Sequence, residues 1–306
     1  MLSIGVQTKG IVADRGEIAG GFQKIAKAGF TKVDFNLDDF LKNHDVYSGR
    51  IQSIFNKEVA ELVEIFQKYK QAMDEAGLMP SQMHAPYPIY VPGQPQATQY
   101  MQGSVIPKSI IIAEVLGIPW TVMHPFKLQY THGKEYEKTA NLEYFQMLIP
   151  LLKQCRVKVC LENLYEGVGT RITEGVCADP EEAIWYIDTL NAIAEEELFG
   201  FCLDTGHLQL VKRDPYEFIK KLGSRIKAVH LHENDGENDV HQLPFTFAKG
   251  MEWEKVWKGL KEVGFAGTLS FETFPAMGSF PYNTSDAVLK LIHDVGEYMV
   301  KQIEDI

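Results

Sequence analysis

This 306-residue sequence lacks the features that mark membrane, secreted and metal-thiolate proteins. No apolar run approaches the roughly 20 residues needed to cross a membrane, and the opening MLSIGVQTKG has neither the basic nor the apolar part of a signal peptide. The four cysteines are scattered with no CxxC pair, which predicts buried thiols. We therefore expect a soluble, cytoplasmic protein that has no membrane partner.

Clustered positive charge is also missing. The chain has 30 Lys and Arg against 41 Asp and Glu, a net charge of −11, and no Lys/Arg-rich block of the kind that follows a phosphate backbone. This disfavours nucleic acid as a partner, although a local basic patch can exist on an acidic protein. No GxGxxG follows the first expected strand, so a dinucleotide-binding fold has little support.

What the chain does contain is a regular alternation of short β-rich runs and longer amphipathic stretches. Eight strands are expected, at residues 3–7, 32–36, 80–84, 121–124, 158–162, 200–204, 228–232 and 269–272. The intervening segments repeat apolar residues at i, i+3, i+4 and i+7, as amphipathic helices do. Helices are expected at residues 16–28, 57–76, 104–116, 139–154, 180–195, 214–222, 252–263 and 284–303.

This alternation predicts parallel βαβ units in an α/β fold. Eight units favour a closed (β/α)8 TIM barrel, which typically needs about 250 residues, over an open sheet. Four expected helices stop at a glycine, which can take the left-handed conformation that ends a helix: Gly29, Gly77, Gly117 and Gly264. No composition break or linker interrupts the chain, so we expect a single TIM-barrel domain over residues 1–306.

Ionisable side chains recur where the expected strands end, from the third strand to the eighth. These residues are His84, His124, Glu162, Asp204, His207, His230, His232, Asp239, His241 and Glu272. A barrel gathers the carboxyl ends of its strands around one mouth, where catalytic groups lie. Residues that are far apart in the sequence should therefore converge there.

Four of these residues form the most specific pattern: Glu162, Asp204, His230 and Glu272, from four consecutive expected strands. Three carboxylates and an imidazole in one pocket would be buried at high cost unless a cation joined them. Divalent metals use these ligand types. The pattern predicts a divalent metal cofactor, with Mn²⁺ favoured by the carboxylates and Zn²⁺ or Mg²⁺ as alternatives.

Each residue also has an ordinary structural explanation. Asp204 could cap the helix that follows it, and a lone histidine at a strand end is often only hydrogen-bonded. Six successive strand ends of this kind are hard to obtain that way. His230 and His232 are two residues apart and should face the same side of their strand. We expect His230 to be the ligand, and His232 to be a substrate contact, a base or a hydrogen-bonded rim residue. The other histidines, His44, His132 and His293, are expected on the surface.

Four stretches together resemble the xylose isomerase-like TIM-barrel superfamily, which includes sugar-phosphate isomerases, ketose 3-epimerases and endonuclease IV. They are Leu-Glu162-Asn163, Leu-Asp204-Thr-Gly-His207, Val-His230-Leu-His232-Glu-Asn-Asp-Gly and Asp239-Val-His241-Gln-Leu-Pro. The resemblance covers essentially the whole chain. Its epimerase branch implies one metal on Glu162, Asp204, His230 and Glu272, with Glu162 and Glu272 also acting as an acid/base pair.

This resemblance makes a metal-dependent sugar isomerase or epimerase the leading hypothesis. Such an enzyme would act in carbohydrate metabolism on a small-molecule sugar or sugar derivative through a metal-stabilised enediolate. By analogy with the fold class, it could be a homo-oligomer. One alternative is a lyase that acts on an oxidised sugar or glycoside with the same site. A barrel that only binds a ligand is disfavoured by the intact ligand set.

The endonuclease branch gives a second alternative, a three-metal phosphodiesterase. Its three-zinc cluster implies nine ligands, and matching residues stand here at His84, His124, Glu162, Asp204, His207, His230, Asp239, His241 and Glu272. The residues outside the four-residue core therefore hold further metals or contact substrate. The segment 85–90 could supply aromatic wedges for DNA, but we favour a lid over a sugar ring. Nearby aromatic residues could stack on substrate or pack in the barrel: Trp120, Phe126, Tyr165 and Phe274.

One stretch departs from the family pattern. A Gly-rich turn often follows the strand-seven histidines in isomerase-like members, whereas this chain has the apolar stretch 243–250, LPFTFAKG. The replacement puts a carried-over phosphate or substrate contact in doubt. It suggests instead an unusual substrate part or a partner surface.

Overall fold

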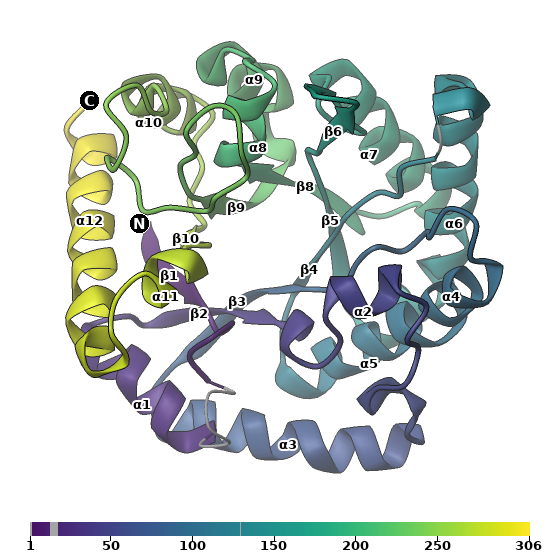
Figure 1. Ribbon diagram of the computed structural model, residues 1–306, viewed down its shortest axis with the longest axis horizontal. Coiled ribbons are helices and arrows are strands. Elements are labelled where there is room, and N and C mark those ends of the chain that lie inside the picture. Colours follow the sequence, from purple (N-terminus) through teal and green to yellow (C-terminus); the bar gives the residue numbers. More distant parts are fainter. Residues whose placement is uncertain (1, 13–17, 129) are drawn as a thin grey trace.

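A computed structural model describes every residue except 1, 13–17 and 129 (Figure 1). Eight parallel strands form a closed barrel in the order β1-β10-β9-β8-β5-β4-β3-β2, which confirms the (β/α)8 TIM barrel. The strands are β1 (Ser3–Gln7), β2 (Lys32–Asn36), β3 (Met79–His84), β4 (Trp120–Met123), β5 (Lys158–Glu162), β8 (Phe199–Asp204), β9 (Ile226–Leu231) and β10 (Thr268–Phe271). Each lies within two residues of the expected bounds.

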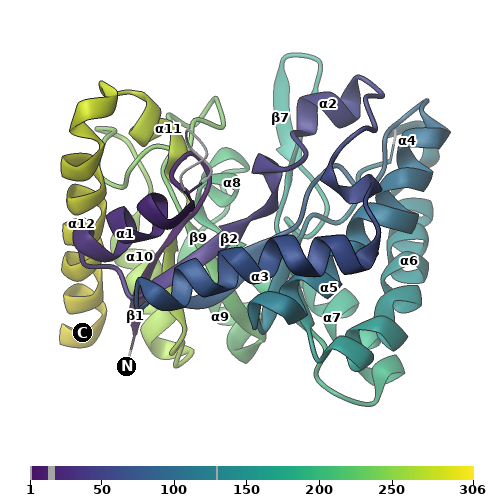
Figure 2. The same ribbon diagram turned by 90° about the horizontal axis from the view of Figure 1, so that it is seen from below.

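Long helices surround the barrel (Figures 1 and 2). They are α1 (Ile18–Ala28), α3 (Val59–Glu75), α5 (Ile106–Leu116), α6 (Lys134–Cys155), α7 (Pro180–Ala194), α9 (Pro215–Leu222), α10 (Trp253–Glu262) and α12 (Ser285–Asp305). The predicted start of the first helix, at 16, falls outside the described residues. Helix α6 begins five residues before the predicted 139, because its first turn is charged and carries no apolar periodicity.

The predicted helix stops are confirmed. Gly29, Gly77, Gly117 and Gly264 all have positive φ, between 69° and 108°. Such a backbone conformation costs a residue with a side chain more than it costs glycine. Each glycine therefore turns the chain from its helix toward the next strand.

The connections at the mouth contain short elements that the periodicity did not predict. They are α2 (Asn43–Tyr47), α4 (Pro95–Tyr100), a π-helical turn (Met101–Val105), α8 (Thr205–Leu210), α11 (Phe274–Gly278) and the antiparallel hairpin of β6 (Tyr165–Val168) and β7 (Arg171–Glu174). Short 3-10 turns lie at Leu37–Asp39, Ile54–Asn56, Tyr130–His132, Gly223–Arg225 and Tyr282–Thr284. Figure 2 shows α2 and β7 rising together at one end of the barrel.

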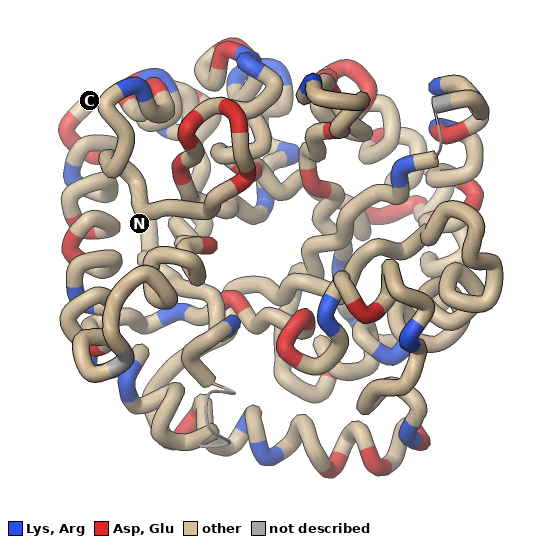
Figure 3. Tube along the Cα trace, in the orientation of Figure 1, with Lys and Arg blue, Asp and Glu red and all other residues tan. Residues whose placement is uncertain are grey.

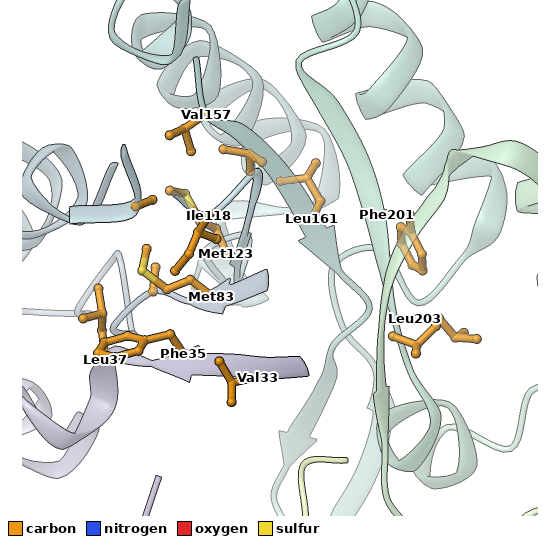
Figure 4. Packing of buried hydrophobic residues seen from close by; sticks show 14 of the residues in the cluster. Val33, Phe35, Leu37, Met83, Ile118, Met123, Val157, Leu161, Phe201 and Leu203 are labelled. Carbon is orange, nitrogen blue, oxygen red and sulfur yellow. The ribbon is translucent and has the colours of Figure 1, made fainter. Parts of the chain in front are cut away.

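The strands divide their side chains between the outer core and the barrel interior. Outward apolar residues such as Phe35, Leu161 and Leu203 join the core beneath the helices (Figure 4). The alternate residues face inward, as strand geometry requires. At mid-barrel they form a small separate cluster of Val122, Cys160, Cys202 and Ala228. This layer closes the barrel below the ionisable residues that end the same strands.

All four cysteines are buried and free, as predicted. His44 and His132 are exposed, as predicted, but the surface position of His293 is wrong. Its ring is buried, packs edge-on against Phe30 at 5.1 Å and lies close to Gly29, where the missing side chain leaves room for it. Among the described helices, none combines the length and apolarity needed to cross a membrane.

Candidate metal centre

All ten ionisable residues singled out in the sequence lie together at the barrel mouth. Seven of them line a cavity of about 570 Å³: His84, His124, Glu162, His207, Asp239, His241 and Glu272. The other three, Asp204, His230 and His232, lie beneath its floor and are fully buried. The strand ends thus bring distant residues to one place because the barrel is closed.

The predicted four-residue core converges on one point. Glu162, Asp204, His230 and Glu272 each offer one ligand atom, and these four atoms lie within 4.8 Å of one another. The His230 Nδ1 atom lies 3.2 Å from Glu162 Oε1 and 3.5 Å from Glu272 Oε2. It lies 3.9 Å from Asp204 Oδ2. Three carboxylates around one imidazole, all buried, offer donor atoms of the kinds that divalent cations use.

A second group shares Glu162. The Nε2 atoms of His84 and His124 lie 3.1 Å apart, and Glu162 Oε2 lies 3.0 Å from His124 Nε2 and 3.5 Å from His84 Nε2. That oxygen is buried and makes no hydrogen bond of proper geometry with any described residue. A tetrahedral zinc ion with bonds near 2.1 Å would place its ligand atoms about 3.4 Å apart. The spacing of these three atoms therefore fits a metal.

A third group lies at the outer side of the mouth. Asp239 Oδ2 lies 3.3 Å from His207 Nε2 and 3.2 Å from His241 Nε2. The three atoms form another possible ligand set. The residues present fit a single metal in the four-residue core, and they also fit two further ions beside it.

The site concentrates negative charge that its imidazoles offset. Burial alone would raise the pKa of Glu162, but His124 and His230 hold it well below its usual range. Burial would lower the pKa of His84, yet the facing Glu162 carboxylate raises it to about 9. Asp204 and Asp239 outweigh the effect of burial on His207 and raise its pKa to about 10. A divalent cation would take over this balancing role and displace the protons.

Asp204 combines two roles that the sequence left as alternatives. One oxygen, Oδ1, accepts the backbone N–H of His207 at 2.6 Å and caps α8. The other, Oδ2, faces His230 and lies 2.9 Å from His232 Nε2. The cap fixes the carboxylate in place, so it supports the candidate ligand role of Asp204.

The histidine two residues after His230 faces the same interior, as expected. The His232 ring stacks on His241 with 3.8 Å between their centroids. A Cβ atom on Gly206 would lie 1.9 Å from His232 Cε1. The glycine of the Asp-Thr-Gly-His stretch is therefore required for the His232 ring to occupy its place.

Asp34 supports the site from below, and the sequence analysis missed it. His230 Nε2 lies 3.0 Å from Asp34 Oδ2, which also accepts hydrogen bonds from Gln82 Nε2 at 2.7 Å and Ser270 Oγ at 3.2 Å. A carboxylate behind a ligating imidazole fixes its tautomer and orientation. The available signal was an acidic residue between the apolar Val33 and Phe35, in the middle of the strand.

Aromatic rings form much of the cavity wall. Tyr87 stacks on His124 at 4.4 Å, Tyr165 lies 5.2 Å from His207, and Phe274 lies 5.1 Å from His241. Tyr90 and Phe126 line the same cavity, so the segment 85–90 is part of its wall. Of the two alternatives that the sequence left for Trp120, the structure shows barrel packing: it begins β4 and packs on the mid-barrel cluster.

The stretch 243–250 takes no part in the described cavity lining. It is tied to the buried Glu233 carboxylate, which accepts N–H groups from Thr246 at 3.2 Å and Met251 at 3.0 Å. Phe245 is 47% exposed and packs on Trp257 and Tyr298 instead. A substrate contact from this stretch is therefore not seen.

Residues 22–290 match the family described as xylose isomerase-like TIM barrel. Protein y4fM of Sinorhizobium fredii, an uncharacterised protein, is 31% identical over 168 residues, which cover 54% of this chain and 50% of that protein. Inosose dehydratase of Clostridium botulinum is 32% identical over 101 residues, 28% of this chain and 34% of that enzyme. The chain thus spans half the length of the first relative and a third of the second.

A solved structure of L-ribulose 3-epimerase has the same fold, with a TM-score of 0.71, 14% identity and coverage of 100% of this chain and 96% of that one. At this identity the likeness concerns the fold alone. The family match, in contrast, spans most of the sequence and agrees with the closed barrel. The chain belongs to the xylose isomerase-like TIM-barrel family.

Proposed function

We propose that the chain isomerises or epimerises a sugar or sugar derivative at a divalent metal held by Glu162, Asp204, His230 and Glu272. The observation that carries this proposal is the convergence of three carboxylates and one imidazole at an aromatic-walled cavity of about 570 Å³. That volume is in the usual range for small-molecule sites, about 300–1,000 Å³. Aromatic walls suit a sugar, whose ring faces stack on them.

Two residues of the core, Glu162 and Glu272, also line the cavity and can reach a bound substrate. A bound divalent cation would polarise the substrate carbonyl and stabilise the negative charge that develops on it. One carboxylate then removes the proton from the adjacent carbon, and the other returns a proton to the opposite face or to the neighbouring carbon. Asp204 and His230 are buried and do not line the described cavity, so they would hold the metal without contacting substrate.

The comparisons support sugar chemistry in general terms. One relative is named inosose dehydratase, and a protein of the same fold is named L-ribulose 3-epimerase. Removal of a proton beside a carbonyl can begin an isomerisation, an epimerisation or a lyase reaction. The lyase alternative therefore uses the same residues and differs in what leaves the neighbouring carbon.

Solvent deuterium exchange tests the proposal. The metal-loaded protein is incubated in D2O with a panel of ketoses, and deuterium uptake beside the carbonyl is followed by NMR. We expect exchange with at least one ketose and its loss in Glu162→Gln and Glu272→Gln. Glu61→Gln on α3 is the matched control, since Glu61 pairs with Lys57 on the surface. If no ketose of the panel takes up deuterium, with the native protein or with Glu162→Gln, the isomerase would be excluded.

The two further ligand groups favour a second candidate, a three-metal phosphodiesterase. His84, His124 and Glu162 form one group, and His207, Asp239 and His241 form the other. Against this, acidic and basic residues are interspersed over the described helices (Figure 3), and the net charge is −11. Salt-sensitive binding of abasic DNA, with cleavage that needs all three metals, would place this candidate first.

A further inference from the structure

Lys127 is a cation in the cavity wall that the proposed chemistry does not use. It follows β4 and His124, is part-buried, and lines the same cavity as Glu162 and Glu272. Its ammonium donates to the backbone carbonyl of Tyr165 and lies 4.9 Å from the centroid of the Tyr165 ring. An ammonium has three donors, so this contact leaves two of them for other acceptors.

No carboxylate of the described residues forms an ion pair with Lys127. Four carboxylates are near enough to raise its pKa, but none of these described residues forms an ion pair with it: Glu166, Asp239, Glu137 and Glu162. The other cavity lysine, Lys9, differs in this respect: it pairs with Asp38 at 3.0 Å and lies 4.2 Å from the Phe274 ring centroid. Only Lys127 of these two cations is left without a carboxylate.

Burial lowers the pKa of Lys127, which agrees with an ammonium whose charge its surroundings do not fully offset. A neutral sugar is recognised by hydrogen bonds to its hydroxyl groups and does not require a cation in the cavity wall. An anionic group would bind such a cation, because a charge-assisted hydrogen bond is about twice as strong as a neutral one.

We propose that Lys127 binds an anionic group of the substrate, a carboxylate or a phosphate, while the rest of the sugar reaches the metal centre. Lys127 is then the residue that determines specificity for a sugar acid or sugar phosphate over a neutral sugar. The sugar part of this inference rests on the proposed function, whereas the anion site does not. The bound anion satisfies the donors that Tyr165 leaves free.

Binding of three ketoses that differ only at C6 tests this inference without turnover. Isothermal titration of the metal-loaded protein compares D-fructose, D-fructuronate and D-fructose 6-phosphate. We expect one of the two anions to bind at least about tenfold more tightly than D-fructose, and the preferred anion identifies the group. In Lys127→Met this preference is lost, whereas Lys127→Arg retains much of it.

Lys158→Met is the matched control, because Lys158 also lies over an aromatic ring, 5.0 Å from the Trp120 centroid, but at the other end of the barrel. It should leave the preference unchanged. Equal binding of all three ketoses by the native protein, or a preference that survives in Lys127→Met, would overturn the proposal. If Lys127→Met unfolds, loss of the preference in Lys127→Gln decides the matter.

Failure of the two proposals gives different results. If an anion binds through Lys127 but no ketose exchanges deuterium, the anion site is supported and the isomerase is excluded. If ketoses exchange and the native protein shows no preference for an anion, the isomerase stands and the role of Lys127 falls.

Discussion

At the scale of single residues, the ten ionisable side chains of the mouth were found in the sequence because each ends or follows a strand. Asp34 and Lys127 were missed for opposite reasons. Asp34 lies in the middle of β2, where its inward direction depends on the barrel being closed. Lys127 lies in a connection, where no periodicity indicates that it faces the cavity.

Asp34 should govern how tightly the four-residue core binds a metal. Asp34→Asn keeps the shape but removes the carboxylate behind His230 Nε2, so we expect metal affinity to fall roughly 10–100-fold. A competition titration with a chelating dye measures the change. Asp45→Asn, which affects only surface pairs with Arg50 and His44, should bind metal like the native protein. Equal affinities in the two variants would show that Asp34 does not support the ligand.

Gly206 should tolerate no side chain. Because its Cβ would overlap His232, Gly206→Ala must displace the ring or the backbone. We expect the free energy of unfolding to fall by about 1–3 kcal/mol in urea denaturation. Gly103→Ala is the control, since nothing lies within 4 Å of that Cβ position. A free energy of unfolding equal to that of the native protein would show that the His232 ring can adopt another position in Gly206→Ala.

At the scale of elements, the barrel strands and the long helices could be predicted because each repeats a pattern over several residues. The short elements of the mouth could not. The β6–β7 hairpin and helices such as α2 and α8 are too short for a period to show. They are held instead by particular contacts, such as the cap that Asp204 gives α8.

The connection between β9 and α10 depends on one such contact. Glu233 accepts backbone N–H groups from Thr246 and Met251, and the same connection carries Asp239 and His241. We expect Glu233→Ala to increase amide hydrogen exchange over residues 242–251 by a large factor.

Glu237→Ala is the matched control for this change, because Glu237 lies exposed in the same connection. It should leave exchange over residues 242–251 as it is. Unchanged protection in Glu233→Ala would show that packing alone holds the connection.

At the scale of the whole molecule, the fold explains how an acidic chain brings ionisable groups together in one place. The apolar outer core and the mid-barrel layer hold the strand ends at fixed positions. A single domain over residues 1–306 and a homo-oligomer stay predictions. Composition and periodicity carry no information about either the metal count or the sugar, because both depend on where side chains meet.

Metal binding should depend on pH in a defined direction. His84 and His207 have pKa values raised to about 9 and about 10. In the metal-free protein, protonation of these two histidines stabilises the fold. This stabilisation is fully present below their ordinary pKa of 6.5, and it is lost as the pH rises through the raised pKa values of about 9 and about 10.

A metal bound by these imidazoles must displace the protons, so affinity for the metal should increase as the pH rises. Calorimetric titration in buffers of different ionisation enthalpy counts the protons released per metal. Affinity that does not change with pH, without proton release, would mean that neither histidine binds a metal.

The proposed chemistry depends on a divalent metal bound at the strand ends. A crystal soaked in Mn²⁺ and measured for anomalous scattering tests it most directly. We expect a strong peak among Glu162, Asp204, His230 and Glu272, whether or not peaks also occupy the two neighbouring groups. An ordered mouth with no peak among these four residues would contradict it.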